Sequence, residues 1–448
     1  MKVVVIGAGE VGNHLTAHLA ADGHDVLLIE ADAAKAAVSQ DQLNALVVQG
    51  NGASMKVLER VGARDADLIA AVTNLDEVNI VACVSGKALG IPRRIARVTN
   101  EDFYITGAGR SMREVGVDLM INPDLVAALE IERLVSLPGA TDVVDFGEAR
   151  VRMVGAYVLP GARAIGVSLR DVAQQFGPQP ATVVAIIRDG ATLIPDGQTR
   201  LIEGDHVYLV GPRGAMRDLM GLLGHDTAPI RNVMLVGASP IARTVARHLV
   251  EHKVQVKLIE NLRSKAEWTA DQLDRVLVLN GDGTDAELLK SESVDQMDAF
   301  IATTNSDDTN IMSCVLARHL GVDKTITTVR RSDYIPLLPA IGLHAAVSVR
   351  LATAATIMRF CRKGEIVSMA QLKEIDAEVL ELVVREDARA VGRTLSKLHL
   401  PKGAVVGSVI RRDGALVVPR GNTEIEHGDR VVVFALPATL PAVEKAFA

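Results

Sequence analysis

The first thirty residues place a glycine-rich turn between two short apolar runs. A β-branched run at residues 3–6 leads into residues 7–12, GAGEVG, after which the spacing of apolar residues becomes helical. A second apolar run at residues 26–29 ends at Glu30, 23 positions after Gly7. Strand, glycine turn, helix, strand and terminal acid follow the order and spacing of a dinucleotide-binding βαβ unit. We therefore expect a parallel sheet with a nucleotide site at its edge.

Each glycine and the terminal acid of such a unit has its own physical role. Gly7 permits the tight turn, Gly9 lets the backbone approach a pyrophosphate, and Gly12 lets the helix pack close to the strand. The helix N-terminus offers free N–H groups and a positive dipole end to phosphates. Glu30 can accept hydrogen bonds from both ribose hydroxyls and would repel a 2′-phosphate, which favours NAD or a plain adenine nucleotide over NADP. A GxGxxG turn alone also occurs where nothing binds, so the prediction rests on the whole unit.

Length and composition exclude several classes of protein. A chain of 448 residues is too long for one ordinary core and predicts two to four domains. The formal charge of −7 and the lack of a basic tract argue against nucleic acid as a partner. No apolar run approaches the roughly 20 residues of a membrane-spanning helix, which predicts a soluble protein. Three widely spaced cysteines predict a reducing cytosol, and the histidines lack the spacing of metal ligands.

The glycine-turn unit occurs twice. Residues 237–242, GASPIA, stand 230 positions after residues 7–12, and Glu260 stands 230 positions after Glu30. Beyond one inserted residue the offset is 231, and the matched pairs are Asn51 with Asp282, Thr73 with Thr304, Asn79 with Asn310 and Cys83 with Cys314. The recurrence predicts two large domains of the same fold, and the matched cysteines are expected to be small buried residues of a helix.

A smaller module follows each large domain. From about residue 141 the pattern changes to short strands and tight turns, with a hairpin signal at Arg188-Asp189-Gly190 that recurs at residues 412–414. We therefore predict an α/β chain of two Rossmann-like, doubly wound parallel-sheet domains, each followed by a small α+β domain. The predicted boundaries are 1–124 and 230–350 for the large domains, and 140–226 and 364–448 for the small ones.

The two predicted nucleotide sites differ. In the second, Ser239 replaces the glycine that lets the backbone meet the pyrophosphate, and it adds a Cβ and a hydroxyl at that point. Pro240 suits a first helical turn, and both Glu260 and Asp282 are present. Two interpretations remain open. The second site is weaker or selective for another nucleotide, or the second unit is a vestigial, structural Rossmann domain.

The chain resembles the TrkA family of peripheral cytosolic subunits of bacterial Trk potassium uptake, which carry tandem RCK (also called KTN) N-domains and C-domains. The resemblance covers essentially the whole chain. It rests on residues 7–12, GAGEVG; 47–50, VVQG; 71–79, AVTNLDEVN; 94–98, RIARV; and the repeats. It implies that each large domain is an RCK N-terminal domain and that each small one is an RCK C-terminal domain.

The resemblance implies regulation without catalysis. RCK units of this family form a ring, commonly from a homotetramer of two-repeat chains, that docks on a TrkH-type potassium-translocating membrane subunit. The protein would then be cytoplasmic and peripheral on the cytoplasmic face of the inner membrane. The implied ligands are NAD(H) and also ADP or ATP. Their binding would bias the pore through a difference in affinity for two ring states.

The resemblance also carries roles to matching residues. Glu30 would hold the adenosine ribose, Asn51 lies where the family contacts adenine, and Arg97 matches a basic position facing the phosphates. The other interpretation of Arg97 is a solvated charge at a strand end. In the second repeat Thr328 stands there, with Arg330 and Arg331 nearby. The predicted nucleotide-binding residues are Gly7, Ala8, Gly9, Glu10, Val11, Gly12, Glu30, Asn51, Thr73, Asn74, Arg97, Gly237, Ser239, Glu260, Asp282 and Thr304, with no catalytic residue and no metal ligand.

The main alternative is an NAD-dependent oxidoreductase, because the first thirty residues would serve one equally well. The sequence argues against it, since none of the four tyrosines has a lysine four positions later, as a short-chain dehydrogenase requires. A small hairpin-rich module follows the first large domain, where an enzyme would need a substrate domain. A third possibility is a structural scaffold whose nucleotide only stabilises the fold.

Overall fold

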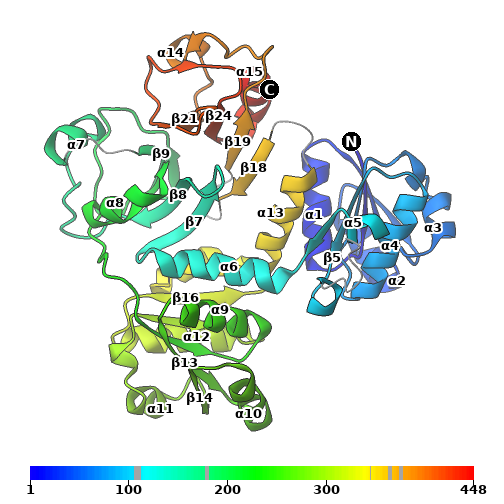
Figure 1. Cartoon of the computed structure of the whole chain (residues 1–448), viewed down its shortest axis with the longest axis horizontal. Helices are drawn as coiled ribbons and strands as arrows, with labels where there is room; N and C mark the ends of the chain where they lie inside the picture. Colours follow the sequence, from blue (N-terminus) through cyan, green and yellow to red (C-terminus); the bar gives the residue numbers. More distant parts are fainter. Residues whose placement is uncertain (105–111, 177–180, 344, 362–365, 373–376, 448) are drawn as a thin grey trace. The chain divides into compact units, whose positions relative to one another are not determined.

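The computed structural model describes residues 1–104, 112–176, 181–343, 345–361, 366–372 and 377–447 (Figure 1). The chain divides into two compact units, of residues 1–127 with 348–362 and of residues 128–347 with 363–448. Residues 364 and 448, the predicted limits of the fourth domain, lie outside the described residues. No helix in the described part of the chain is long and apolar enough to cross a membrane.

The first unit is built on a six-stranded parallel sheet of order β3-β2-β1-β4-β5-β6. Its strands are β1 (Lys2–Ile6), β2 (Asp25–Glu30), β3 (Leu46–Gln49), β4 (Leu68–Ala71), β5 (Arg93–Arg97) and β6 (Leu119–Ile121). Its helices include α1 (Glu10–Ala21), α2 (Ala33–Gln42), α3 (Met55–Arg60), α4 (Asp76–Ala88) and α5 (Met112–Val115), and α6 (Pro123–Ser136) begins there. The order reverses between β1 and β4, which makes the carboxyl ends of these strands the topological switch point where ligands bind in such sheets.

Apolar runs without polar interruption explain the central strands. Val3, Val4 and Val5 in β1 are fully buried, as expected for a parallel strand covered on both faces. Cys83 and Cys314 are also fully buried, which confirms the prediction of core cysteines, and burial raises the pKa of each thiol to about 12.

A helix from far along the chain completes the first unit. Helix α13 (Val349–Cys361) packs on α1, and Arg93 Nη1 donates to the carbonyl of Phe360 at 3.0 Å. In the second unit, α6 contacts α9 (Pro240–Glu251) through His248 Nδ1 and Glu132 Oε2, 3.0 Å apart. Each large domain is therefore covered by a helix that follows the other large domain in sequence.

The second large domain repeats the first. Its sheet has the order β14-β13-β12-β15-β16-β17, and the pairs from β14 to β16 are parallel. The strands are β12 (Asn232–Val236), β13 (Gln255–Glu260), β14 (Val276–Asn280), β15 (Ala299–Ala302), β16 (Thr325–Val329) and β17 (Ala345–Ser348). Helices α10 (Arg263–Gln272), α11 (Ala286–Ser291) and α12 (Asp307–His319) follow α9 in order. The prediction of two Rossmann-like domains is confirmed.

Each small domain is an antiparallel sheet with short helices. The first has the order β10-β9-β11-β8-β7, and the second has β18-β19-β24-β21-β22 beside a β20–β23 pair. Their strands are β7 (Ala140–Phe146), β8 (Val151–Tyr157), β9 (Thr182–Arg188), β10 (Ala191–Leu193), β11 (His206–Pro212), β18 (Ile366–Gln371), β19 (Glu378–Val383), β20 (Arg393–Thr394), β21 (Ala404–Ile410), β22 (Leu416–Val417), β23 (Glu424–Ile425) and β24 (Arg430–Ala435). Their helices are α7 (Leu169–Phe176), α8 (Met216–Leu222), α14 (Leu395–Leu398) and α15 (Leu440–Phe447).

The two small domains share one core. Phe146 and Tyr208 from the first and Val379 and Phe434 from the second belong to one cluster of buried side chains. The predicted hairpin joins β9 to β10, with φ of 53° at Asp189 and 75° at the following glycine, as a primed turn requires.

Candidate nucleotide-binding sites

The glycine turn between β1 and α1 combines two crowded positions with an open one. Gly7 has a φ of +103°, and a Cβ there would lie 3.0 Å from Thr73 Cγ2. A Cβ on Gly12 would lie only 1.8 Å from the Gly7 carbonyl oxygen. By contrast, no atom lies within 4 Å of a Cβ built on Gly9. The fold therefore needs glycine at the first and third positions, whereas the space beside Gly9 is open to a ligand.

Helix α1 begins with donors that the helix itself does not use. Its N-cap is Gly9, which makes no side-chain cap, and the N–H of Asn13 is bonded to the Gly9 carbonyl at 2.9 Å. The N–H groups of Glu10, Val11 and Gly12 precede that bond and have no partner within the helix. With the positive end of the helix dipole, they form a site for phosphate oxygens.

Glu30 is held beside this helix end by two backbone groups. Its Oε2 accepts the N–H of Ala8 at 2.6 Å, and its Oε1 accepts the N–H of Asp32 at 2.8 Å. A carboxylate has about four acceptor positions, so these two bonds orient Glu30 and leave its other acceptor positions open to a ligand. The arrangement can hold a ribose hydroxyl close to a helix end suited to phosphates.

The remaining predicted residues of the first site lie at the carboxyl ends of β3, β4 and β5. Asn51 Oδ1 accepts the N–H of Ala53 at 3.0 Å, which shapes the loop after β3. Arg97 Nη1 donates to Asn74 Oδ1 at 3.0 Å across the exits of β4 and β5. Parallel strands bring these loops to the same edge as the glycine turn.

Sequence reasoning missed a buried asparagine that connects these loops. Asn79 is fully buried on α4, and its Oδ1 accepts the N–H of Thr73 at 2.9 Å and its hydroxyl at 2.8 Å. Its Nδ2 donates to the carbonyls of Thr73 at 3.0 Å and Arg97 at 2.8 Å. The available signal was its recurrence as Asn310, which makes the same bonds to Thr304. Asn79 therefore fixes the loops at the carboxyl edge of the sheet, and Thr73 lies beside Gly7 of the glycine turn.

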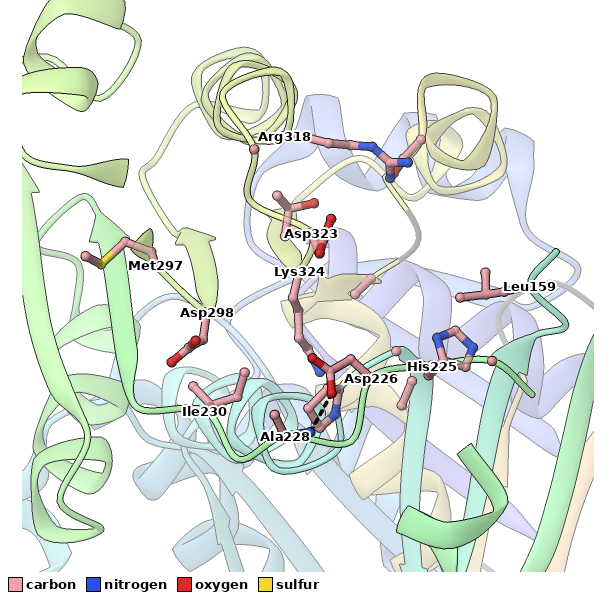
Figure 2. A pocket seen from close by; sticks show the side chains of 18 of the residues that line it. Leu159, His225, Asp226, Ala228, Ile230, Met297, Asp298, Arg318, Asp323 and Lys324 are labelled. Carbon is pink, nitrogen blue, oxygen red and sulfur yellow. Dashed lines mark hydrogen bonds between the residues drawn. The ribbon is translucent and has the colours of Figure 1, made fainter. Parts of the chain in front are cut away.

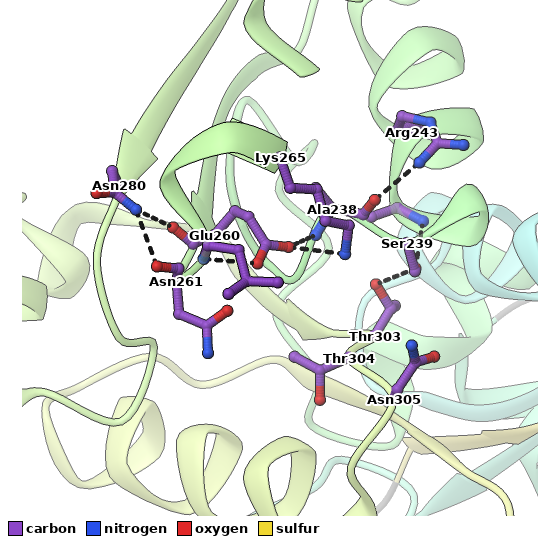
Figure 3. A network of polar contacts seen from close by, with 12 residues as sticks. Ala238, Ser239, Arg243, Glu260, Asn261, Lys265, Asn280, Thr303, Thr304 and Asn305 are labelled. Carbon is purple, nitrogen blue, oxygen red and sulfur yellow. Dashed lines mark hydrogen bonds and ion pairs between the residues drawn. The ribbon is translucent and has the colours of Figure 1, made fainter. Parts of the chain in front are cut away.

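The second site brings together the matching residues of the second repeat. Gly237, Ser239, Glu260, Asp282 and Thr304 line one cavity of about 330 Å³. Many of its polar groups are bonded to one another (Figure 3).

The side chain of Ser239 is turned inward, which differs from the predicted position of its hydroxyl at the pyrophosphate. Its Oγ donates to Thr303 Oγ1 at 3.1 Å and accepts the N–H of Ala242 at 3.1 Å. The reason is Thr303, a buried partner at the position where the first repeat has Val72. The hydroxyl therefore caps α9.

An arginine from a different position reaches the strand exits of the second repeat. The buried hydroxyl of Thr328, which matches Arg97, donates to the Ala302 carbonyl at 3.3 Å. Arg330 Nη2 instead donates to Asn305 Oδ1 at 3.1 Å, as Arg97 does to Asn74 in the first repeat. A guanidinium is thus present at both sites, supplied from β5 in one and from just beyond β16 in the other.

Glu260 is bonded more fully than Glu30. It accepts the N–H groups of Ala238 at 2.8 Å and Leu262 at 3.0 Å, and Lys265 Nζ lies 2.9 Å from its Oε2. Burial raises the pKa of Glu260, but the N–H groups of Leu262 and Ala238 and the Lys265 ammonium lower it more, so the pKa lies below its usual value. Glu260 is therefore a paired carboxylate.

Comparisons with known proteins decide the family. The TrkA-N domain family matches residues 3–123 and 233–349, and the TrkA-C domain family matches residues 153–224 and 379–448. The chain belongs to the TrkA family. The predicted resemblance is therefore confirmed.

Relatives over the full length agree. Trk system potassium uptake protein TrkA homolog 1 of Methanosarcina mazei is 36% identical over 455 residues, covering 100% of each chain. Trk system potassium uptake protein TrkA of Vibrio alginolyticus is 33% identical over 445 residues, covering 97% of this chain and 95% of the relative. Both relatives are named as potassium uptake proteins, and neither carries the name of an oxidoreductase, the alternative considered from the sequence.

Solved structures support the fold. The GsuK RCK domain superposes with a TM-score of 0.60 at 18% identity, covering 99% of this chain and 94% of that one. The GsuK channel bound to NAD gives a TM-score of 0.60 at 17% identity, covering 99% of this chain and 78% of that one. These matches confirm the tandem RCK architecture.

The TrkA-family chain has another cavity, of about 650 Å³, between its first small domain and its second large domain (Figure 2). Tyr157 and His225 line it from one side and Met297 and Lys324 from the other. Lys324 Nζ donates to the carbonyls of Leu134 and, at 2.8 Å, Leu137, at the end of α6. Burial lowers the pKa of Lys324 to about 7. The lysine thereby ties α6 to β16, and no sequence motif pointed to it.

This buried lysine predicts a dependence of stability on pH. The folded pKa is below that of an unfolded lysine, so between about pH 7 and pH 10 the unfolded state binds more protons and stability rises with pH. The contribution is at most about 1.4 kcal/mol per pH unit. Thermal unfolding from pH 7 to about pH 8.5, below the range where the thiols of Cys83 and Cys314 ionise in the unfolded state, should show this rise in the wild type and lose it in Lys324→Met. The exposed Lys56→Met is the control, and an unchanged slope in Lys324→Met would contradict the prediction.

Proposed function

We propose that this chain is the regulatory subunit of a Trk-type potassium uptake system and that it binds NAD(H), or ADP or ATP, at its first site. The observation that carries the proposal is the position of Glu30. Its carboxylate lies beside the uncapped N-terminus of α1, oriented by Ala8 and Asp32, so that one edge offers acceptors for a ribose and donors for phosphates.

This geometry and the family resemblance together support an assignment of residues to the nucleotide. Phosphates bind at the turn and the first turn of α1, the ribose binds at Glu30, and the adenine lies beside the loop after β3. The first-site residues are Gly7, Ala8, Gly9, Glu10, Val11, Gly12, Glu30, Asn51, Thr73, Asn74 and Arg97. The matching residues of the second repeat are Gly237, Ser239, Glu260, Asp282 and Thr304, and they bind a nucleotide weakly at most.

The regulated target is a TrkH-like membrane subunit. The chain acts as a homotetramer whose RCK domains form a ring on the cytoplasmic face of the inner membrane, and nucleotide occupancy changes the ring. A nucleotide can shift the pore only by its difference in affinity for two ring states. Membership of the TrkA family supports this role, and the fold shared with the GsuK channel, which was captured bound to NAD, supports NAD as the first ligand to test.

Calorimetric titration of the purified chain with NAD, NADH, ADP and ATP tests the site. Glu30→Ala removes charge-assisted acceptors worth about 1.5–3 kcal/mol each, so the tightest affinity should fall about 100-fold. Asp41→Ala removes an exposed acid from α2 and should leave binding unchanged. Wild-type affinity in Glu30→Ala would contradict the proposed site.

Potassium uptake tests the role. Cells that lack the chain should import potassium more slowly through the TrkH-like subunit, and the wild-type gene should restore import while the Glu30→Ala gene restores it only partly. Normal import without the chain would contradict the proposal. NADH turnover at enzymatic rates on small carbonyl compounds would support the oxidoreductase alternative instead.

A further inference from the structure

The second repeat bonds to itself the groups that the first repeat leaves open. In the first repeat the α1 N-terminus has no side-chain cap, and within the described part of the chain Glu30 accepts hydrogen bonds from two backbone N–H groups and from no side chain. In the second repeat a side chain of the chain itself occupies each position, Ser239 at the helix end and Lys265 at the carboxylate.

The helix end of the second repeat has fewer donors for a phosphate. Pro240 stands at the start of α9 and has no N–H, where the first repeat has Glu10. The N–H of Ala242 is bonded to Ser239 Oγ at 3.1 Å. Three N–H groups open α1. Of the matching groups in α9, only the N–H of Ile241 remains for a ligand. The serine hydroxyl thus takes up an N–H group that would otherwise be open to a phosphate oxygen.

The two repeats also differ at the lysine that follows the ribose-binding acid, and at one of its neighbours. Lys35 matches Lys265, but among the described residues no ion pair joins it to Glu30. The N–H groups of Lys35 and Ala34 donate to Asp32 Oδ1 at 3.0 and 2.8 Å and lower the pKa of that carboxyl, so Asp32 caps α2. In the second repeat Leu262 replaces Asp32.

Lys265 Nζ lies 2.9 Å from Glu260 Oε2, an ion pair with no counterpart between Lys35 and Glu30 among the described residues. The Glu260 side chain is only 4% exposed, and its two backbone N–H bonds hold it in place for the ammonium. A ribose hydroxyl that binds Glu260 must first displace this ammonium.

We propose that the second repeat closes its own nucleotide site, because Ser239 takes up a helix N–H group that a phosphate would use and Lys265 pairs with the acid that a ribose would use, so that each chain senses one nucleotide at the first repeat. The proposal rests on the proposed function, whose site it refines. It makes Lys265 and Leu262 the residues that set the number of nucleotides bound per chain.

Titration with ADP and NADH in a Glu30→Ala background isolates the second site in the full chain. Adding Lys265→Met removes the competing ammonium, and adding Leu262→Asp supplies the acid that the first repeat has at this position, a second carboxylate that can compete with Glu260 for Lys265. If the ion pair leaves about one molecule in ten open, each change should strengthen binding about tenfold. Because Leu262 is exposed and is the uncapped N-cap of α10, its aspartate variant should fold normally.

Two controls separate this effect from a structural one. Lys265→Arg keeps a cation beside Glu260 and should leave the second site closed, and Lys35→Met removes a lysine that pairs with no ribose-binding acid. Ser239→Gly with Pro240→Glu restores the first-repeat residues at the helix end and should strengthen binding further when combined with Lys265→Met.

The outcomes discriminate between the two proposals. Two equal sites per wild-type chain, or no gain in both the Lys265→Met and Leu262→Asp variants, would overturn the closed second site. If the wild-type chain binds no nucleotide at all, the proposed function fails, and a gain in those two variants would still support the closed site.

Discussion

Replacing Gly12 with alanine is expected to lower the free energy of unfolding of the first unit by about 3 kcal/mol, at the upper end for overpacking. The new Cβ would lie 1.8 Å from the Gly7 carbonyl oxygen and 3.3 Å from Val72 Cγ2, so α1 must move away from β1. That shift displaces the phosphate-binding N–H groups, and nucleotide affinity should fall with stability. Chemical denaturation and calorimetry of the same preparation would measure both.

Two matched variants show whether packing is the cause. Gly9→Asp places its Cβ in open space, so it should fold like the wild type and lose binding through steric and charge conflict with phosphate. Ala242→Gly changes the matching residue of the second repeat, and its cost should be near the roughly 1 kcal/mol helix propensity of glycine. Wild-type stability of Gly12→Ala would show that α1 can move without loss, and would contradict the prediction.

Replacing Asn79 with leucine is expected to destabilise the first unit by about 4 kcal/mol, because several buried polar groups lose their partners at about 1–3 kcal/mol each. Asn79 bonds the N–H, hydroxyl and carbonyl of Thr73 and the carbonyl of Arg97, and it is fully buried. Leucine has a similar size and satisfies none of them. Denaturant unfolding followed by circular dichroism would measure the loss of stability. The fit should allow the two units to unfold in separate transitions.

The exposed neighbour Asn74 provides the comparison for this substitution. Its side chain accepts only the Arg97 guanidinium, at 3.0 Å, so Asn74→Ala should change the free energy of unfolding by less than about 0.5 kcal/mol. The pair separates the buried network from the exposed loop at one strand exit. Equal stabilities of Asn79→Leu and Asn74→Ala would show that the network contributes nothing.

The fold was predictable because it follows from local sequence patterns that occur twice. Apolar runs, glycine turns and helical spacing each depend on neighbouring residues, and the 230-residue offset tests every assignment in a second copy. The candidate sites were predictable in part for the same reason, since motif residues near strand ends converge in a parallel sheet. Asn79 was missed because a buried amide in a helix has no distinctive spacing, and only its recurrence indicated a role.

The sequence alone determined the element order, the two repeats and the residues at the carboxyl edge of each sheet, because these follow from periodicity and chain direction. Only the tertiary structure decided which side chains meet across that edge. Ser239 bonds inward to Thr303, and Lys265 pairs with Glu260, whereas among the described residues no ion pair joins the matching Lys35 to Glu30. It also decided that α13 covers α1, although the two helices lie more than 300 positions apart in the chain. Such contacts depend on which surfaces can bury apolar area and satisfy charge together, and spacing along a chain does not encode that choice.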